Sequence, residues 1–376
     1  MQLSAAFESG SIEVVEAADP GNVRLRIPTD SASDYRMWFY FRVSGVRATA
    51  LRLVFENAGE CTYPSGWEGG YRVSASYDRK DWFRVPTAYD GTTMTVSHRA
   101  ERDCVYYAYF APYTAERQHD FVGRCLASPL ARHEVLGTSL DGNDIELMTI
   151  GDSGAGKRAC WLIARHHPGE TQGSFWLEGL CERLLDGSDP IARRLLARAV
   201  FHIVPNINPD GSRRGNHRTN AAGKNLNRAW AEPTMEKTPE VFVVRERMET
   251  LGVDFLIDAH AVEWHPYTFI ISSDRVPSLT DHLLQLRTRF DEALAQASPD
   301  HATEYGYPHD GNRPIQPTLC SSWVADHFAC LALTLEMPFN DHAALPEPRA
   351  GWSPERSHRL GAASIEALNA VVDDLR

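Results

Sequence analysis

Short runs of hydrophobic residues recur through the first 110 residues of the chain. They are rich in Val, Ile, Tyr and Phe, and turn sequences such as Asp90-Gly91 separate them. Strand-length segments at spacings of roughly 8–12 residues are typical of an antiparallel β-sandwich. The segments predicted as strands are 11–15, 23–27, 37–43, 50–55, 71–77, 93–97 and 105–110. We therefore expect an antiparallel β-sandwich domain at residues 1–112, and we find no candidate catalytic group in it.

After residue 137 the hydrophobic segments alternate with helical ones, which indicates an α/β domain, and we assign residues 113–376 to it. Several of its strands are almost continuously apolar, as expected for strands that are covered on both faces. The predicted strands are 145–150, 159–164, 199–204, 255–260, 268–272 and 331–337. The predicted helices are 171–185, 191–198, 239–250, 279–297 and 354–375.

Polar residues stand at the ends of these buried strands, where α/β proteins place their sites. His167 and Glu170 follow one strand, and His260 ends another. Two imidazoles and one carboxylate around an open position are typical of catalytic zinc, whereas structural zinc has four protein ligands. A His-x-x-Glu match alone is a weak signal in a chain with 15 histidines. The pattern therefore indicates a zinc site, with a solvated pair of loop residues as the alternative.

Glu336 is a carboxylate inside an otherwise apolar strand. Burying an unpaired charge is costly, so such a residue is either paired or placed near a metal. A glutamate close to a zinc site is suited to take a proton from water and pass it to a leaving amine. Glu336 is therefore a candidate general base, and a salt-bridged structural glutamate is the alternative.

The segment 212–228 reverses the overall charge of the chain. It contains five Lys or Arg and no Asp or Glu, although the net charge of the whole chain is −12. A solvated basic loop is one explanation. Asn227 and Arg228 are suited to hold a carboxylate, and Arg218 is suited to neutralise an oxyanion. A carboxylate receptor beside zinc would make the protein an exopeptidase that acts at the C-terminus of a chain.

The acidic balance, with a sequence pI of about 5.7, argues against nucleic acid or an anionic membrane as the main partner. We see no signal-peptide pattern, and no apolar run approaches the roughly 18 residues that span a bilayer. The seven cysteines form no Cys-x-x-Cys pair, which fits free thiols in a reducing compartment. We therefore expect a cytoplasmic location, and the sequence leaves the oligomeric state open.

Five motifs occur in a fixed order: HPGE, PNINPDG, GNHRTNAAGKNLNRAW, DAH and TLEMPF. Together they closely resemble the zinc metallocarboxypeptidases, and in particular the cytosolic carboxypeptidase branch. The resemblance covers nearly the whole chain and includes AFESGSIEVVEA, WFYFRVSG and FAPYTAER in the N-terminal part. It implies a β-sandwich followed by an α/β/α catalytic domain around a mixed eight-stranded sheet.

The resemblance also implies the roles of the candidate site residues. His167, Glu170 and His260 match the ligands of one zinc ion per chain, and Glu336 matches the general base. Zinc suits such a donor set, although cobalt and other divalent ions bind similar sites.

Arg218 matches the arginine that polarises the scissile carbonyl, and Asn227 with Arg228 matches the pair that binds the terminal carboxylate. Many relatives carry a carboxylate two residues before this pair, where it orients a zinc-bound imidazole. In this chain the position is Asn225. An amide accepts the same hydrogen bond but raises the basicity of the ligand less, so we expect weaker metal binding.

A second departure concerns the tyrosine that closes over substrate in secreted relatives. The corresponding position is Pro314, so Tyr305 or Tyr307 would have to act from a shifted loop. Ser321, close to where secreted relatives set their side-chain preference, is neutral and indicates no preference.

The cytosolic branch includes enzymes that trim glutamate from protein C-termini and side chains. The expected partners are therefore peptide or protein C-terminal tails, with a preference for acidic residues that the basic segment 212–228 would suit. Arg313 is a possible further contact, with a solvated loop residue as the alternative. Two other functions remain: a zinc deacylase of N-acyl amino acids, and a catalytically silent module that binds C-terminal tails.

Overall fold

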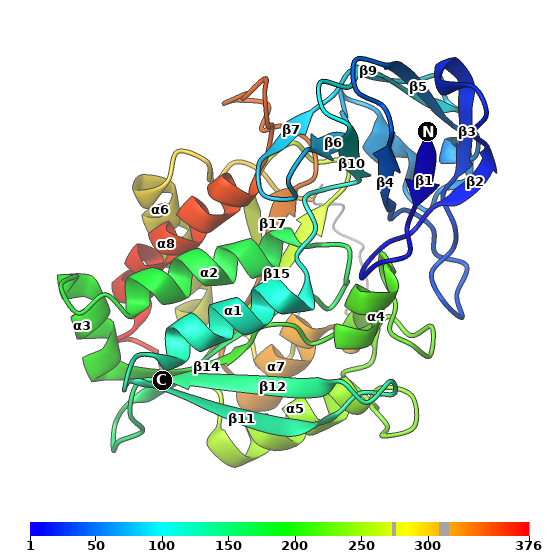
Figure 1. Ribbon diagram of the computed structural model, residues 1–376. Helices are drawn as coiled ribbons and strands as arrows, with labels where there is room; N and C mark the ends of the chain where they lie inside the picture. The colour runs from blue at the N-terminus through cyan, green and yellow to red at the C-terminus, as the bar shows by residue number, and fades with distance from the viewer. Residues whose placement is uncertain (273–275, 308–315, 376) are drawn as a thin grey trace.

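The computed structural model describes residues 1–272, 276–307 and 316–375. Its N-terminal part, at the upper right of Figure 1, is made of two five-stranded sheets in the orders β1-β4-β10-β6-β7 and β2-β3-β5-β9-β8. The strands are β1 (Gln2–Ser4), β2 (Glu13–Glu16), β3 (Val23–Arg26), β4 (Tyr40–Ser44), β5 (Ala50–Phe55), β6 (Ser74–Ser76), β7 (Trp82–Arg84), β8 (Thr87–Tyr89), β9 (Met94–Arg99) and β10 (Cys104–Ala108).

The two sheets pack together through aromatic side chains. Phe41 of one sheet contacts Phe55 of the other, with 6.2 Å between the ring centroids. The strand pairs are antiparallel except for β3 and β5, which run parallel in this fully described part of the chain. The expected β-sandwich is therefore confirmed, with one parallel pair that the sequence did not predict.

A mixed sheet of seven strands, counted over the described residues, forms the second part in the order β11-β12-β14-β13-β15-β17-β16. Its strands are β11 (Ala131–Thr138), β12 (Asp144–Ile150), β13 (Arg158–Ala164), β14 (Ala199–Val204), β15 (Phe255–Val262), β16 (Phe269–Ser272) and β17 (Leu331–Pro338). The expected mixed sheet is confirmed, but it was expected to have eight strands. Beside β16, His301 pairs with Thr268 in a single bridge and is not part of a strand.

Helices cover both faces of this sheet (Figure 1). They are α1 (Ala115–Leu126), α2 (Gln172–Leu184), α3 (Pro190–Arg198), α4 (Pro209–Arg214), α5 (Pro239–Leu251), α6 (Asp281–Ala297), α7 (Cys320–Phe328) and α8 (Pro354–Val371). Side chains of α2, α6 and α8 share one hydrophobic cluster with alternate residues of the strands, and side chains of α5 and α7 share a second cluster with the others. The result is an α/β/α domain.

Side chains of β15 and β17 point alternately to the two faces of the sheet, and this determines on which face their polar groups lie. Ile257 and Ala259 belong to the cluster beneath α2 and α8, whereas Leu256 belongs to the cluster beneath α7. Because successive strand residues point to opposite faces, Asp258 and His260 lie on the α7 face. This face is where the candidate site forms.

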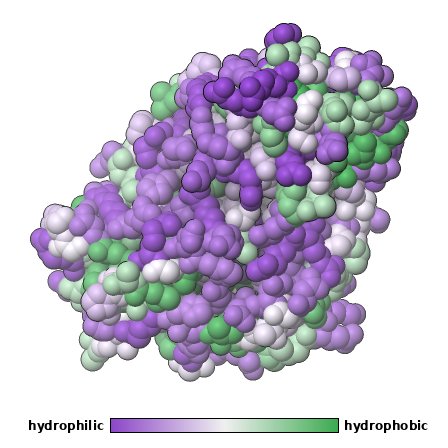
Figure 2. All heavy atoms as spheres, in the orientation of Figure 1, coloured by the Kyte–Doolittle hydropathy of each residue, from purple (hydrophilic) through white to green (hydrophobic). Residues whose placement is uncertain are grey.

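Hydrophilic residues predominate on the face shown in Figure 2, and hydrophobic ones lie in small separate areas. Among the described residues, no helix is both long enough and apolar enough to cross a membrane.

Glu240, in the first turn of α5, is a buried carboxyl group whose titration affects stability. Burial raises its pKa to about 7, although the Asn220 amide donates to both carboxyl oxygens at 3.3 Å. The pKa of Glu240 in the folded state lies above the ordinary value of 4.5, so the folded state holds the proton more tightly than the unfolded state. The contribution of Glu240 to stability is therefore complete below about pH 4.5 and is lost as the pH rises through 7. The free energy of unfolding of Glu240→Gln is compared with that of wild type at each pH. We expect this difference to favour the variant more at pH 8 than at pH 5, by up to about 3 kcal/mol. Denaturant unfolding of both proteins at the two pH values measures the difference, and parallel pH profiles would contradict it.

Candidate active site

The predicted metal ligands meet at the carboxyl ends of three parallel strands. His167 and Glu170 lie in the loop between β13 and α2, and His260 lies in β15. The parallel register places His260 directly beside Glu336 of β17. Four residues that are far apart in the sequence thus come from one edge of the sheet.

The three candidate ligands converge on one point. His167 Nδ1 lies 2.7 Å from Glu170 Oε1, and His260 Nδ1 lies 2.8 Å from Glu170 Oε2. The two Nδ1 atoms are 3.2 Å apart, and all three side chains are buried. This is a donor set of two nitrogens and one carboxylate, as in catalytic zinc sites.

The opposite ring nitrogens are held by hydrogen-bond acceptors. His167 Nε2 donates to Asn225 Oδ1 at 3.1 Å, and His260 Nε2 donates to Asp258 Oδ2 at 2.8 Å. With the protons at Nε2, each Nδ1 directs a lone pair at the common centre. Such partners fix the tautomer and orientation of metal-binding imidazoles, so the residues fit a zinc ion. The amide of Asn225 makes the contact expected from the sequence.

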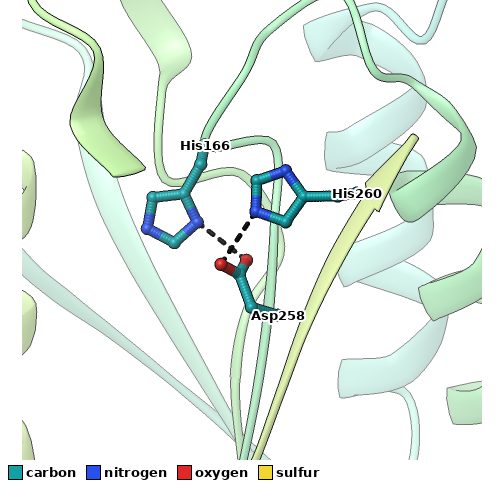
Figure 3. Close-up of side chains that lie close together, drawn as sticks. All are labelled: His166, Asp258 and His260. Atoms are coloured by element: carbon teal, nitrogen blue, oxygen red, sulfur yellow. Dashed lines mark hydrogen bonds and ion pairs between the residues drawn. The ribbon is translucent and has the colours of Figure 1, made fainter. Parts of the chain in front are cut away.

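Asp258 links His260 to a second buried histidine (Figure 3). Its other oxygen, Oδ1, accepts from His166 Nδ1 at 2.8 Å, and Trp230 Nε1 donates to His166 Nε2 at 3.0 Å. An indole nitrogen can only donate, so His166 carries its proton on Nδ1. Burial alone would raise the pKa of Asp258, but the two imidazoles and their hydrogen bonds hold it below its ordinary value.

His166, Asp258 and His260 also lie close enough together to be considered as metal ligands. Their facing atoms are already satisfied by one another and by Trp230. The group of His167, Glu170 and His260 is therefore the better candidate metal site, and Asp258 holds the imidazole of His260 in place. Sequence analysis missed this role, although Asp258 stands two residues before His260 and so on the same face of a strand.

Replacing Asp258 with Asn is expected to lower zinc affinity about 10–100-fold, because the amide is a weaker acceptor and makes the His260 imidazole less basic. Competition with a chromophoric chelator measures the affinity. Asn225→Asp is the matched control, since it supplies His167 with a carboxylate and is expected to raise the affinity. Equal affinities for all three proteins would contradict the assignment.

Glu336 is a buried carboxyl group without an ion pair within the described residues. Tyr307 Oη donates to its Oε1 at 3.2 Å, and its Oε2 has no hydrogen-bond partner among them. Burial raises the pKa of Glu336 to about 8; His260 opposes this, and the carboxylates of Glu170 and Glu263 add to it. A perturbed carboxyl group beside a metal site is typical of a residue that exchanges a proton. The salt-bridged alternative finds no support.

Arg218 approaches the site from the segment after α4. Its Nη1 lies 3.9 Å from Glu170 Oε1, and its side chain is 13% exposed. Tyr35 and Tyr63 of the N-terminal part lie beside the guanidinium, with 5.6 Å and 5.3 Å from Cζ to the ring centroids. The N-terminal domain therefore contributes to the surroundings of the site, which sequence analysis did not expect.

Asn227 is engaged differently from the expectation. Its Oδ1 accepts from the Cys320 amide at 3.0 Å, and its Nδ2 lies 3.1 Å from His260 Nε2. Because the first amides of a helix lack intrahelical acceptors, Asn227 satisfies the start of α7. Arg228 is exposed, and its Nη1 donates to the Asn227 carbonyl oxygen at 3.1 Å. A joint role in binding a carboxylate stays a prediction.

The two candidate tyrosines are placed differently. Tyr307 contacts Glu336, whereas Tyr305 stacks on Tyr267 with 3.6 Å between ring centroids. Arg313 lies outside the described residues. Ser321, in α7, accepts a hydrogen bond from Thr334 at 3.0 Å.

Comparisons with known proteins identify relatives of both parts of the chain. Residues 3–110 match the model of the cytosolic carboxypeptidase N-terminal domain, and residues 126–357 match that of zinc carboxypeptidase. The crystal structure of a metallo-carboxypeptidase from Burkholderia cenocepacia is 46% identical, with a TM-score of 0.96 over 100% of both chains. That of a Pseudomonas aeruginosa metallo-carboxypeptidase in complex with (2-guanidinoethylmercapto)succinic acid is 41% identical, with a TM-score of 0.97 over 100% of both chains.

More distant relatives are longer. Cytosolic carboxypeptidase 6 of Mus musculus is 29% identical over 288 residues, which are 69% of this chain and 53% of that protein. The chain thus spans about half the length of this relative.

Proposed function

The chain belongs to the zinc carboxypeptidase family and is a metallocarboxypeptidase, and on that basis we propose that it removes single residues from the C-termini of peptides or protein tails, with a preference for acidic residues. The observation that carries the reaction is the convergence of His167, Glu170 and His260 beside the buried carboxyl group of Glu336, which forms no ion pair among the described residues. The same site would serve a glutamyl bond on a side chain.

His167, Glu170 and His260 would hold the zinc ion, which when bound supplies a Lewis acid for activating water and polarising a carbonyl group. Glu336 accepts the proton of the attacking water and delivers it to the leaving nitrogen. Arg218 donates to the negative oxygen that develops on the attacked carbonyl. Only the transition state places a full negative charge on that oxygen, so the cationic Arg218 stabilises it more than it stabilises the bound substrate.

The terminal carboxylate of the substrate is bound by Arg228, with Asn227 beside it at the start of α7. A guanidinium group offers paired donors that match the two oxygens of a carboxylate. The exposed position of Arg228 leaves its remaining donors accessible. We assign Tyr307 as the tyrosine that covers the substrate, because its hydroxyl group already lies at the base.

The acidic preference rests on the basic segment 212–228. Arg214 in it is exposed but paired with Asp141 at 2.6 Å. Arg213, Lys224 and Arg228 are also exposed. The relative from Pseudomonas aeruginosa forms a complex with (2-guanidinoethylmercapto)succinic acid, which carries a cationic guanidino group as well as two carboxyl groups. This ligand supports a carboxylate receptor and does not bear on the preference for an acidic side chain.

Peptides that differ only in their last residue test the preference. We expect kcat/KM for terminal Glu or Asp to exceed that for Leu or Lys by about tenfold, equivalent to roughly 1.4 kcal/mol, because the acidic side chain gains a charged contact. Equal or higher rates with Leu or Lys would exclude the preference while leaving the peptidase activity intact.

We place the protein in the cytoplasm, which agrees with its seven free cysteines and with relatives named cytosolic carboxypeptidases. The zinc deacylase remains a competing function, because the same donors and carboxylate receptor would accept N-acyl amino acids. Assaying acyl-amino acids beside peptides separates the two. The silent binding module is disfavoured by the position and surroundings of Glu336.

A further inference from the structure

Asp30 of the N-terminal domain lies against the backbone of the segment that carries Arg218. It stands in the loop between β3 and β4, and the residue is 4% exposed. Oδ1 accepts from the amide of His217 at 2.6 Å, and Oδ2 accepts from the amides of Arg218 at 2.7 Å and Thr219 at 3.0 Å. The Thr219 hydroxyl group donates to Oδ2 at 3.1 Å. One carboxylate therefore holds three consecutive backbone amides.

Such an arrangement fixes the backbone firmly. Hydrogen bonds to an ionised acceptor are roughly twice as strong as neutral ones. Within the described residues, Asp30 forms no ion pair with a Lys or Arg side chain, so the amides and the hydroxyl group themselves compensate its buried charge. The direction in which the Arg218 side chain leaves the backbone is thereby set by a residue of the other domain.

The same domain also holds the side chain of Arg218. Tyr35 and Tyr63 lie within the distance of about 6 Å at which a cation is attracted by an aromatic ring. Arg218 Nε is buried and has no hydrogen-bond partner among the described residues. The guanidinium group is thus held by rings, which leaves its Nη donors for a substrate.

Neighbouring contacts extend this junction along the segment. The Ser31 amide donates to Asn216 Oδ1 at 2.9 Å, and Ser9 Oγ donates to the Ser212 carbonyl oxygen at 2.7 Å. Gly223 has a φ of +70°, and a side chain there would clash with the carbonyl oxygen of Ala32. Figure 1 shows the short helix α4, which begins this segment, directly below the N-terminal sandwich.

We propose that the N-terminal sandwich is part of the active site, and that its Asp30 is a positioning residue that holds Arg218 in place for the oxyanion of the substrate. This inference rests on the role of Arg218 given under the proposed function. It assigns a task to a domain in which the sequence shows no catalytic group, and it makes activity depend on the junction between the domains.

A double-mutant cycle with Asp30→Asn and Arg218→Ala tests the proposal on the full-length, zinc-loaded protein. An amide offers one acceptor oxygen where the carboxylate offers two, so some of the donors of 217–219 lose their acceptor. We expect Asp30→Asn to lower kcat about tenfold with KM nearly unchanged, and to lower it less than about twofold when Arg218 is already Ala. The proposal would be overturned if Asp30→Asn lowered kcat by the same factor in the wild-type and Arg218→Ala proteins. It would also be overturned if Asp30→Asn did not lower kcat at all.

Ser9→Ala is the matched control, because it removes a buried hydrogen bond of the same junction at Ser212, away from Arg218. It is expected to leave kcat within about twofold of wild type. Asp30→Ser replaces Asp30→Asn if the latter does not fold.

Hydrogen exchange of the amides of 217–219 separates this proposal from the proposed function. We expect exchange at least about tenfold faster in Asp30→Asn and unchanged in Ser9→Ala, whether or not any peptide is cleaved. Unchanged exchange in Asp30→Asn would overturn the positioning role. If exchange changes in the two variants as expected but the wild-type protein cleaves no peptide, the proposed function is overturned instead.

Discussion

Replacing Glu336 with Gln is expected to lower kcat for peptide hydrolysis by about 10²–10⁴-fold, because proton transfer by a positioned group contributes that much. The substitution keeps the size of the side chain and an oxygen that can accept from Tyr307. It removes the group that takes a proton from water and returns it to the amine. KM is expected to change little, since Glu336 does not take part in binding the terminal carboxylate.

Single-turnover rates with zinc-loaded protein measure this effect apart from product release. Glu240→Gln is the matched control, because it is the same change at another buried carboxyl group, far along the chain in α5. It is expected to retain the wild-type rate at pH 7. A Glu336→Gln protein that keeps more than about a third of wild-type kcat would show that the general base lies elsewhere.

Replacing His260 with Ala is expected to abolish both activity and tight zinc binding. The side chain is one of the three candidate ligands, and its loss also leaves the fully buried Asp258 with one imidazole fewer. In the wild-type protein, zinc at 100 times its Kd stabilises the folded state by about 2.7 kcal/mol. We expect a chelator to remove this stabilisation and stoichiometric zinc to restore it.

Thermal unfolding with and without zinc therefore gives a readout that does not require a substrate. The Tm of wild type is expected to rise with zinc, and that of His260→Ala to stay constant. A zinc-dependent rise of equal size in His260→Ala would place the metal at another site. Thr334→Val controls for damage to the sheet, because Thr334 lies in β17 on the same face of the sheet as His260. The Tm of this variant is expected to rise with zinc as in wild type.

The central strands could be predicted from the sequence because they are apolar almost without interruption. In β15 and β17 the few polar residues are Asp258, His260, Thr334 and Glu336, and each interrupts a run that burial would otherwise keep hydrophobic. His260 and Glu336 were visible as candidate site residues for the same reason. β13, β14, β15 and β17 accordingly agree with their predicted segments to within two residues at either end.

Elements at the margin of the sheet gave no such signal. β11 is an edge strand whose residues are all exposed or half-buried, so its sequence shows no apolar run. α7 is nine residues long and was missed, although its first amide is capped by Asn227. A cap supplied by a residue 93 positions earlier cannot be seen in a local pattern.

The contribution of the N-terminal domain was missed for a related reason. Asp30 and Tyr35 lie in a loop whose sequence resembles an ordinary surface turn, and Tyr63 resembles a core aromatic residue. Their partners, His217 and Arg218, follow more than 150 residues later, as the sequence separation of 187 between Asp30 and His217 shows. Only the packing of the two domains brings these residues together.

Zinc-dependent carboxypeptidase activity is tested most simply by mass spectrometry of peptides incubated with the zinc-loaded protein. The peptides vary in their last residue, and Glu336→Gln and chelator-treated wild type run beside them. We expect losses of single residues from the C-terminus that both controls abolish. Intact peptides together with hydrolysis of N-acyl amino acids, or cleavage within the peptides, would contradict it.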